Sequence, residues 1–333
     1  MMLLPASYRN RILDPQQGAD QLQAGYRPAD LHVHSSCSYD VLPFPDFHPE
    51  AIYQEAFKQD FAFISITDHD TMDAYDIIGW ERERLVPGVE ITLCDPVRVG
   101  HTIHVNVYQL NKSQFKTLSD IAQKDRNIET FVAFLKDQNL PYTYNHPFWF
   151  VPKEKPNYRA VDEIIELFPV IEYNMKRVRK KNLMALWLAG KYNKGIIAST
   201  DTHIGKIGRA YTLSQGETFA EYFENIANCN AYIVPQDLNI KNLNYEIATW
   251  IEVMFSLDDV DWEKSRITGF KAVDELINFF AMNTSEDYPR VFPLMESFFR
   301  KIAKTGFFSL LYLGSQNYKA RKIRKLLEIP NLA

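Results

Sequence analysis

The feature that most constrains the fold is a regular alternation of short apolar runs and helical stretches up to about residue 213. Helical patterns lie between most of the runs, for example over residues 49–60, 119–138 and 175–192. Strands separated by helices pair in parallel, and seven of them favour a closed α/β barrel over a sandwich. The seven runs of strand length cover residues 29–34, 61–67, 85–92, 103–110, 142–146, 169–174 and 195–200.

The remainder of the chain has a different character. From about residue 214 a helical pattern dominates, and the C-terminus is basic and aromatic. We therefore expect an N-terminal segment (residues 1–27), an α/β barrel (residues 28–213) and a helical C-terminal region (residues 214–333). An acidic stretch within that last region contains Asp258, Asp259, Asp261 and Glu263.

Charge and cysteine content narrow the function classes. The net charge of −5 argues against a long nucleic acid as the partner of the surface as a whole. The three cysteines, Cys37, Cys94 and Cys229, are odd in number and widely spaced, so they predict no disulfide framework and favour the cytoplasm. No apolar stretch approaches the eighteen or so residues of a transmembrane helix, and we expect a soluble protein whose oligomeric state the sequence leaves open.

Histidines and carboxylates gather where the predicted strands end. The first run carries His32 and His34, which share a strand face because side chains alternate, and Asp40 follows in the next loop. The second run ends in Thr67-Asp68-His69-Asp70. In that segment we expect His69 to bind metal and Asp70 to cap a helix that begins at Thr71.

Later runs add further ligands of the same kinds. Glu90 lies in an apolar strand with no Lys or Arg beside it in sequence, so a metal is the cation that would compensate its charge. Asp201 and His203 share one face after the last run. His104 and His146 lie on the fourth and fifth runs. We choose His104 over His101, because Asn106 and Tyr108 continue its face.

The positions of the histidines predict one site. Six of the eight lie on five predicted strands, mostly at or just past their C-terminal ends, where α/β barrels assemble active sites. His48 and His101 remain as ordinary surface or supporting residues. Imidazole and carboxylate ligands without thiolate suit zinc, manganese or iron.

In this order, the ligand motifs resemble the PHP (polymerase and histidinol phosphatase) family over residues 28–213. The resemblance implies a distorted (β/α)7 barrel with a trinuclear metal centre, and all nine family ligand positions are filled. It implies one ion on His32, His34, Glu90 and Asp201, a second on Glu90, His104 and His146, and a third on Asp40, His69 and His203. The catalytic set implied is His32, His34, Asp40, His69, Glu90, Asp201 and His203.

The predicted function is hydrolysis of a phosphate mono- or diester of a small molecule or nucleotide by a metal-bound hydroxide, with two or three divalent ions. Alternatives are an exonuclease on short single strands, a C–N hydrolase of amidohydrolase type and a non-catalytic metal-stabilised module. Lys206 and Arg209 either bind the substrate phosphate or belong to a solvated loop. The aromatic residues Phe148, Trp149 and Phe150 either pack the core or stack on a ring of the substrate, and packing is favoured.

The C-terminus allows two interpretations. Residues 300–325 hold eight Lys and Arg side chains and no acidic residue, with Phe and Leu interleaved. The first interpretation is a helical cap on the barrel, whose basic side chains also compensate the charge of the acidic stretch. The second is a docking surface for an anionic partner, either a membrane face or a nucleic acid.

Overall fold

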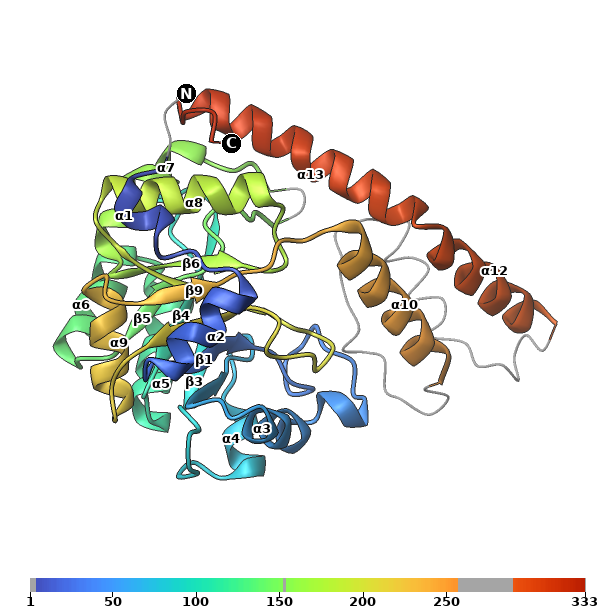
Figure 1. The fold of residues 1–333 in the computed structure, drawn as a ribbon, viewed down its shortest axis with the longest axis horizontal. Coiled ribbons are helices and arrows are strands. Elements are labelled where there is room, and N and C mark those ends of the chain that lie inside the picture. The colour runs from blue at the N-terminus through green and yellow to red at the C-terminus, as the bar shows by residue number, and fades with distance from the viewer. Residues whose placement is uncertain (1–3, 152–153, 257–289, 333) are drawn as a thin grey trace.

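The computed structural model describes residues 4–151, 154–256 and 290–332 and places their strands in two sheets (Figure 1). The sheet orders are β2-β1-β8-β9 and β3-β4-β5-β6-β7. The acidic stretch from Asp258 to Glu263 lies outside the described residues. The strands are β1 (Arg27–Val33), β2 (Phe63–Ile66), β3 (Gly88–Cys94), β4 (Thr102–Tyr108), β5 (Tyr142–Tyr144), β6 (Val170–Asn174), β7 (Gly195–Ser199), β8 (Tyr211–Ser214) and β9 (Tyr232–Val234).

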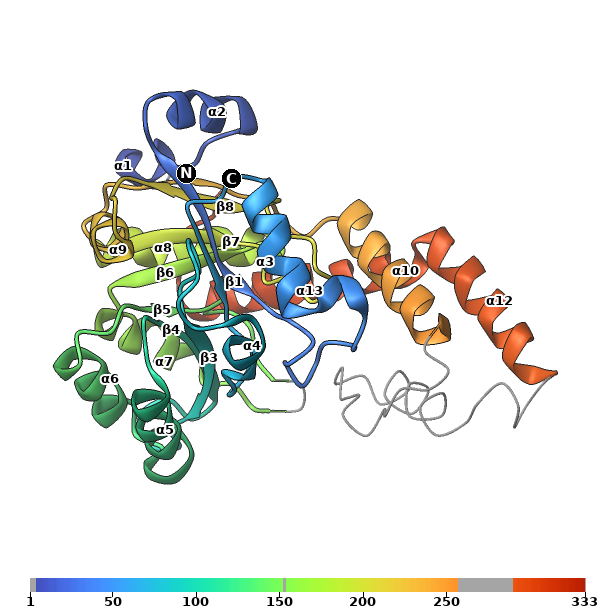
Figure 2. The same cartoon turned by 90° about the horizontal axis from the view of Figure 1, so that it is seen from below.

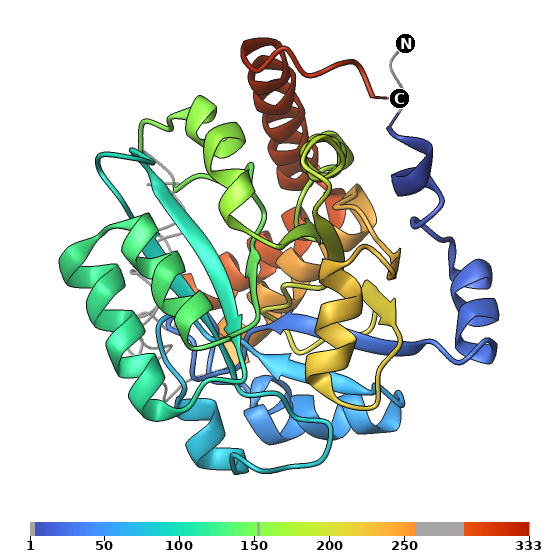
Figure 3. The same ribbon diagram turned by 90° about the vertical axis from the view of Figure 1, so that its left-hand side faces the viewer.

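Helices cover the outside of these sheets (Figures 1 and 3). The described residues also form three short helical turns, η1 (Pro45–Phe47), η2 (Ile121–Asp125) and η3 (Ile165–Leu167). None of the described helices combines the length and hydropathy that a membrane span requires. The α-helices are α1 (Ala6–Arg9), α2 (Pro15–Gln23), α3 (Pro49–Lys58), α4 (Asp73–Ile78), α5 (Lys112–Asp120), α6 (Ile128–Asp137), α7 (Tyr158–Ile164), α8 (Arg179–Lys191), α9 (Phe219–Ala227), α10 (Ile240–Ser256), α12 (Val291–Thr305) and α13 (Phe307–Leu326).

Local sequence signals set several helix ends. Capping boxes open α2, α5 and α9, where Asp14, Asn111 and Thr218 each accept a hydrogen bond from the backbone N–H three residues on. The single helix predicted over residues 119–138 is divided instead. Arg126 takes a left-handed conformation with φ of 50°, and Asn127 then caps α6.

All seven predicted strands are present, but the expected barrel is only partly correct. The fold is mixed α/β, and closure of a barrel is not detected among the described strands. Isolated bridges link the two sheets: His69, after β2, bridges to Glu90 on β3, and Val33 on β1 bridges to Thr202, after β7. Pairing is also not uniformly parallel, because β4 runs antiparallel to both of its neighbours, β3 and β5.

The connections explain part of this difference. Between β3 and β4 the chain has only residues 95–101, which is too short for the crossover that a parallel pair needs. The strands β8 and β9, which were not predicted, extend the first sheet by antiparallel pairing with β1 and with each other. The region from residue 214, predicted to be helical, therefore also contributes a strand.

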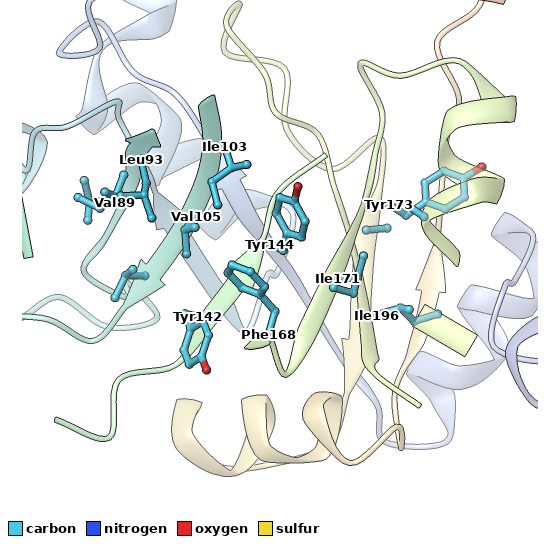
Figure 4. Close-up of a cluster of buried hydrophobic side chains, with 14 of the residues drawn as sticks. Val89, Leu93, Ile103, Val105, Tyr142, Tyr144, Phe168, Ile171, Tyr173 and Ile196 are labelled. Carbon is cyan, nitrogen blue, oxygen red and sulfur yellow. The ribbon is translucent and has the colours of Figure 1, made fainter. Parts of the chain in front are cut away.

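Strand alternation separates the core from the site. On β3, Val89 and Leu93 are fully buried in the hydrophobic core, whereas Glu90 points to the other face. Figure 4 shows this core continuing across β4 to β7, with Tyr144 stacked on Phe168 at 4.8 Å between ring centroids. The apolar faces thus hold the strands together and leave the opposite faces for polar side chains.

The C-terminal helices lie at one end of the molecule. Figure 1 shows α12 lying beside α10 and projecting away from the sheets, whereas α13 runs back over α8. Gly306 joins α12 and α13 with φ of 71°. The Nζ of Lys181 on α8 donates to Oε1 of Gln316 on α13 at 2.8 Å, and Arg300 on α12 pairs with Glu252 on α10.

Candidate metal centre

The structure brings all nine predicted ligands into one cluster. Seven are buried, and Asp40 and His203 are partly exposed. Four groups of three or four residues have ligand atoms within 4.8 Å of one another, which is consistent with a multi-metal site. The nine are His32, His34, Asp40, His69, Glu90, His104, His146, Asp201 and His203.

Glu90 lies at the centre of the cluster and presents one oxygen to three histidines. Its Oε2 is 3.2 Å from Nε2 of His32, 3.2 Å from Nε2 of His34 and 3.2 Å from Nδ1 of His69. Burial alone would raise the pKa of Glu90, but the imidazoles of His32 and His69 hold it well below its usual value. The carboxylate is therefore charged and needs cationic partners.

The second oxygen of Glu90 faces a different pair of histidines. Oε1 is 3.2 Å from Nδ1 of His104 and 3.1 Å from Nε2 of His146, and Nδ2 of Asn145 donates to it at 2.8 Å. A carboxylate whose two oxygens face separate nitrogen ligands has the arrangement of a bridging ligand. The sharing of Glu90 between two ions stays a prediction.

Asp201 completes the group around His32 and His34. The two Nε2 atoms are 3.0 Å apart, and Oδ1 of Asp201 lies 3.6 Å from the first and 3.4 Å from the second. Ligands about 2.1 Å from a tetrahedral ion are about 3.4 Å from one another. The separations among these atoms therefore match those of ligands that share one ion.

A third group lies at the exposed edge. Oδ2 of Asp40 is 2.8 Å from Nε2 of His203 and 3.4 Å from Nε2 of His69, and His34 completes the group. Burial opposes the charge on Asp40, but His203 and His69 keep its pKa well below the usual range. This group has the partly open position expected of a site that admits a substrate.

Buried polar atoms without hydrogen-bond partners indicate whether the residues of the cluster fit metal ions. Oε2 of Glu90, Nδ1 of His69 and Nδ1 of His104 are buried, and despite their close approaches none of them has a hydrogen-bond partner among the described residues. Buried polar groups are normally hydrogen-bonded, so such a concentration calls for another kind of partner. Divalent cations fit these atoms because imidazole nitrogens and carboxylate oxygens are their usual ligands.

Glu172 is a site residue that the sequence analysis missed. Its Oε1 is 2.7 Å from Nδ1 of His32, and its Oε2 accepts from the backbone N–H of His146 at 2.8 Å and from Nδ2 of Asn174 at 3.0 Å. A carboxylate on the far nitrogen of a metal-binding histidine fixes the ring orientation and the tautomer. The available signal was the one used for Glu90, a carboxylate within an apolar run.

Two more buried aspartates hold the loops that carry the ligands. The carboxylate of Asp68 accepts from the backbone N–H and the Oγ of Ser35, both at 2.6 Å. Asp30 accepts from Oγ1 of Thr200 at 2.6 Å and from its N–H at 3.2 Å. Burial raises the pKa of Asp68 to about 6 and that of Asp30 to about 7. These contacts tie the ends of β1, β2 and β7 together.

The predicted capping role of Asp70 is wrong. Helix α4 begins at Asp73, and its N-cap, Met72, makes no capping bond through its side chain. Oδ1 of Asp70 instead accepts from the N–H of Thr92 at 2.8 Å, and the residue has φ of 52°. Asp70 thus fastens the loop after His69 to β3, which carries Glu90.

The three aromatic residues after His146 have different environments. Phe148 is buried in the core, as the packing interpretation expected, and Phe150 contacts His101 with 5.2 Å between centroids. Trp149 borders the cluster, because its ring lies 4.7 Å from that of His104. The guanidinium of Arg177 lies 5.6 Å from the Trp149 ring centroid.

Arg177 is a second residue that the sequence analysis missed. One terminal nitrogen lies 3.4 Å from Oδ2 of Asp201, and its buried Nε has no hydrogen-bond partner. No strand pattern pointed to it, because it lies in the loop between β6 and α8. It places a permanent positive charge beside the cluster.

The remaining candidates lie apart from this cluster. Lys206 is exposed, and Arg209 donates to Oδ1 of Asn242 on α10. His48 is exposed and accepts a hydrogen bond at the start of α3, while Nδ1 of His101 lies 3.2 Å from the carbonyl oxygen of Val99. A phosphate-binding role for Lys206 and Arg209 stays a prediction.

Comparison with known proteins gave matches among solved structures alone. No protein-family model matches the chain, and no curated protein does so. A two-domain protein from Bacteroides vulgatus, described as containing a predicted PHP-like metal-dependent phosphoesterase, matches with 20% identity and a TM-score of 0.45, over 64% of this chain and 66% of that one. PsfC from Pseudomonas syringae matches with 15% identity and a TM-score of 0.49, over 68% of this chain and 98% of that one.

A third match is the lesion-specific endonuclease Q of Pyrococcus furiosus, with 15% identity and a TM-score of 0.44, over 62% of this chain and 57% of that one. Identities this low concern the fold alone, so the case for the chemistry rests on the geometry of the cluster. These neighbours include proteins described as a PHP-like metal-dependent phosphoesterase and endonuclease Q, and the buried His and Glu clusters of this chain are consistent with a multi-metal site.

Proposed function

We propose that the chain is a metal-dependent phosphoesterase acting on a phosphate mono- or diester of a small molecule or nucleotide. The observation that carries the proposal is the convergence of six histidines and two further carboxylates around Glu90. A purely structural role would not require so many ionisable groups in one buried place, because each costs free energy when it leaves water.

Two or three divalent ions would be held as the sequence predicts. His32, His34 and Asp201 would share Glu90 with the pair His104 and His146. Asp40, His69 and His203 would hold the outer ion. Zinc, manganese and iron all suit these ligands. Such ions supply a Lewis acid that activates water and neutralises the charge of a phosphate ester.

The protein side chains would orient the substrate and protect the site. Arg177 lies beside Asp201 and has a guanidinium nitrogen without a hydrogen-bond partner among the described residues. The N–H of this nitrogen would donate a hydrogen bond to a phosphoryl oxygen. Trp149 covers His104 on one side and would keep bulk water away. Glu172 would hold His32 in place by accepting a hydrogen bond from its Nδ1–H.

The test is a hydrolysis screen on protein loaded with manganese or zinc. Nucleotides, sugar phosphates, short oligonucleotides and amides are offered, and elemental analysis counts the ions. We expect two or three ions per chain and release of phosphate or an alcohol from one ester class. His69→Ala and Asp201→Ala should abolish turnover while circular dichroism stays unchanged, and His48→Ala serves as the control histidine. Turnover of amides alone, or full activity of His69→Ala, would overturn the proposal.

A further inference from the structure

Charge is strongly segregated along this chain. The C-terminal arm, defined here as residues 290–332 with α12 and α13, contains nine Lys and Arg residues and two Glu residues, a net charge of +7. Because the whole chain carries −5, the rest of the molecule carries −12. A basic element on an acidic protein favours an anionic partner for that element alone.

The arm also exposes large apolar side chains on the same surface. Phe307, Leu311 and Tyr318 fall on one face of α13 at helical spacing, and Tyr318 is 71% exposed. Lys322 and Lys325 continue that face toward the C-terminus. The exposed face therefore has an apolar first half and a basic second half.

Helix α12 adds to this surface. Leu294, which is 71% exposed, and Phe298 lie on its outer face, followed by the exposed Lys301. Figures 1 and 2 show that α12 projects from the sheets. Apolar patches of this kind on a soluble domain mark interaction sites.

A basic groove of about 650 Å³ lies where α13 meets α8. Its lining includes no carboxylate side chain, and none of its five cations makes an ion pair or hydrogen bond within the described parts of the chain. Lys181 is buried at the same helix contact, and among the described residues its ammonium group donates only to the neutral Gln316. The five groove cations are Lys180, Arg321, Lys322, Arg324 and Lys325.

We propose that the C-terminal arm docks this protein on an anionic lipid surface. The exposed Phe and Leu side chains would enter the headgroup region, and the groove cations would bind lipid phosphates. Lipid is favoured over nucleic acid because several exposed side chains are aliphatic, among them Leu294, Leu310 and Leu311. Bases stack on aromatic rings and guanidinium groups, whereas leucines have no planar face to offer. The proposal does not depend on the metal centre.

The experiment is co-sedimentation of the full chain with vesicles of phosphatidylcholine alone and with added phosphatidylserine. We expect binding to the anionic vesicles only and a steep loss with salt, because the Debye length falls to about 3 Å at 1 M. The double variant Lys322→Glu/Lys325→Glu should weaken binding at least about thirtyfold, from about fivefold for each cation lost. The matched control is Lys116→Glu/Lys136→Glu on α5 and α6, which makes the same change in net charge at exposed sites and should bind as the wild type does.

A second pair of variants tests the apolar contribution without changing charge. Leu310→Ser/Leu311→Ser should weaken vesicle binding, and Ile77→Ser/Val97→Ser, at exposed sites elsewhere, should not. Equal binding to neutral and anionic vesicles, or no binding to either, overturns the proposal. The proposal is also overturned if the wild type binds a single-stranded oligonucleotide but no vesicles and the Lys322→Glu/Lys325→Glu variant no longer binds that oligonucleotide. Self-association through the arm without vesicle binding overturns it as well.

Discussion

Lys181 offers a direct test of how the arm is joined to the rest of the molecule. Burial lowers the pKa of its ammonium group from 10.5 to about 7, and the charges of Arg177 and Lys319 act in the same direction. The unfolded chain therefore binds more protons than the folded chain between about pH 7 and pH 10.5. The free energy of unfolding must rise with pH over this range and fall as the pH is lowered through it.

The expected size of this change in the free energy of unfolding follows from that difference in proton binding. Between pH 7 and pH 9 the folded state gains about 2 kcal/mol from this one group. Lys181→Met keeps the volume of the side chain and removes the ionisable group. Urea unfolding at both pH values, followed by circular dichroism, should show the wild type gaining about 2 kcal/mol more than the variant. Lys180→Met, on the same helix, is the control and should behave as the wild type does. Equal increases in the free energy of unfolding of the wild type and of Lys181→Met between the two pH values would refute the reasoning.

Two further predictions concern the site and the core. Glu172→Gln keeps the shape but removes the charge that faces Nδ1 of His32, so metal affinity measured by chelator competition should fall about 10- to 100-fold; an unchanged affinity would mean that Glu172 only fills space. Gly195→Ala places a Cβ 2.3 Å from the carbonyl oxygen of Ile226, and urea unfolding should show a loss of about 1–3 kcal/mol. Unchanged stability of that variant would contradict the close packing of α9 on β7.

The strands could be predicted because their pattern is local. On β4, Ile103 and Val105 are buried in the core and alternate with His104, which faces the cluster. Such alternation is visible in a single sequence. Most of the predicted ligands could be proposed for the same reason, since they lie within a strand or just past its end; Asp40 lies in the loop after β1.

Strand order and direction could not be read in this way. The antiparallel pairs β3–β4 and β4–β5 depend on which strand lies beside which, and an apolar run carries no mark of direction. The strands β8 and β9, four and three residues long, were not among the predicted runs, although β2 and β5 are as short. Arg177 and Asp70 act through loops, where side-chain contacts depend on the folded structure.

The electrostatics of the cluster favour the binding of cations. Glu90 and Asp201 are buried carboxylates whose pKa values lie well below the usual range, so they stay charged at neutral pH. Nearby carboxylates raise the pKa of His32 and His69 although burial opposes this, so protons on the imidazoles balance the anions when no metal is bound. That balance is complete at low pH and is lost as the pH rises through the raised histidine pKa values. Metal ions bound as proposed would occupy the same lone pairs as those protons, so rising pH would remove the competitor and favour metal binding.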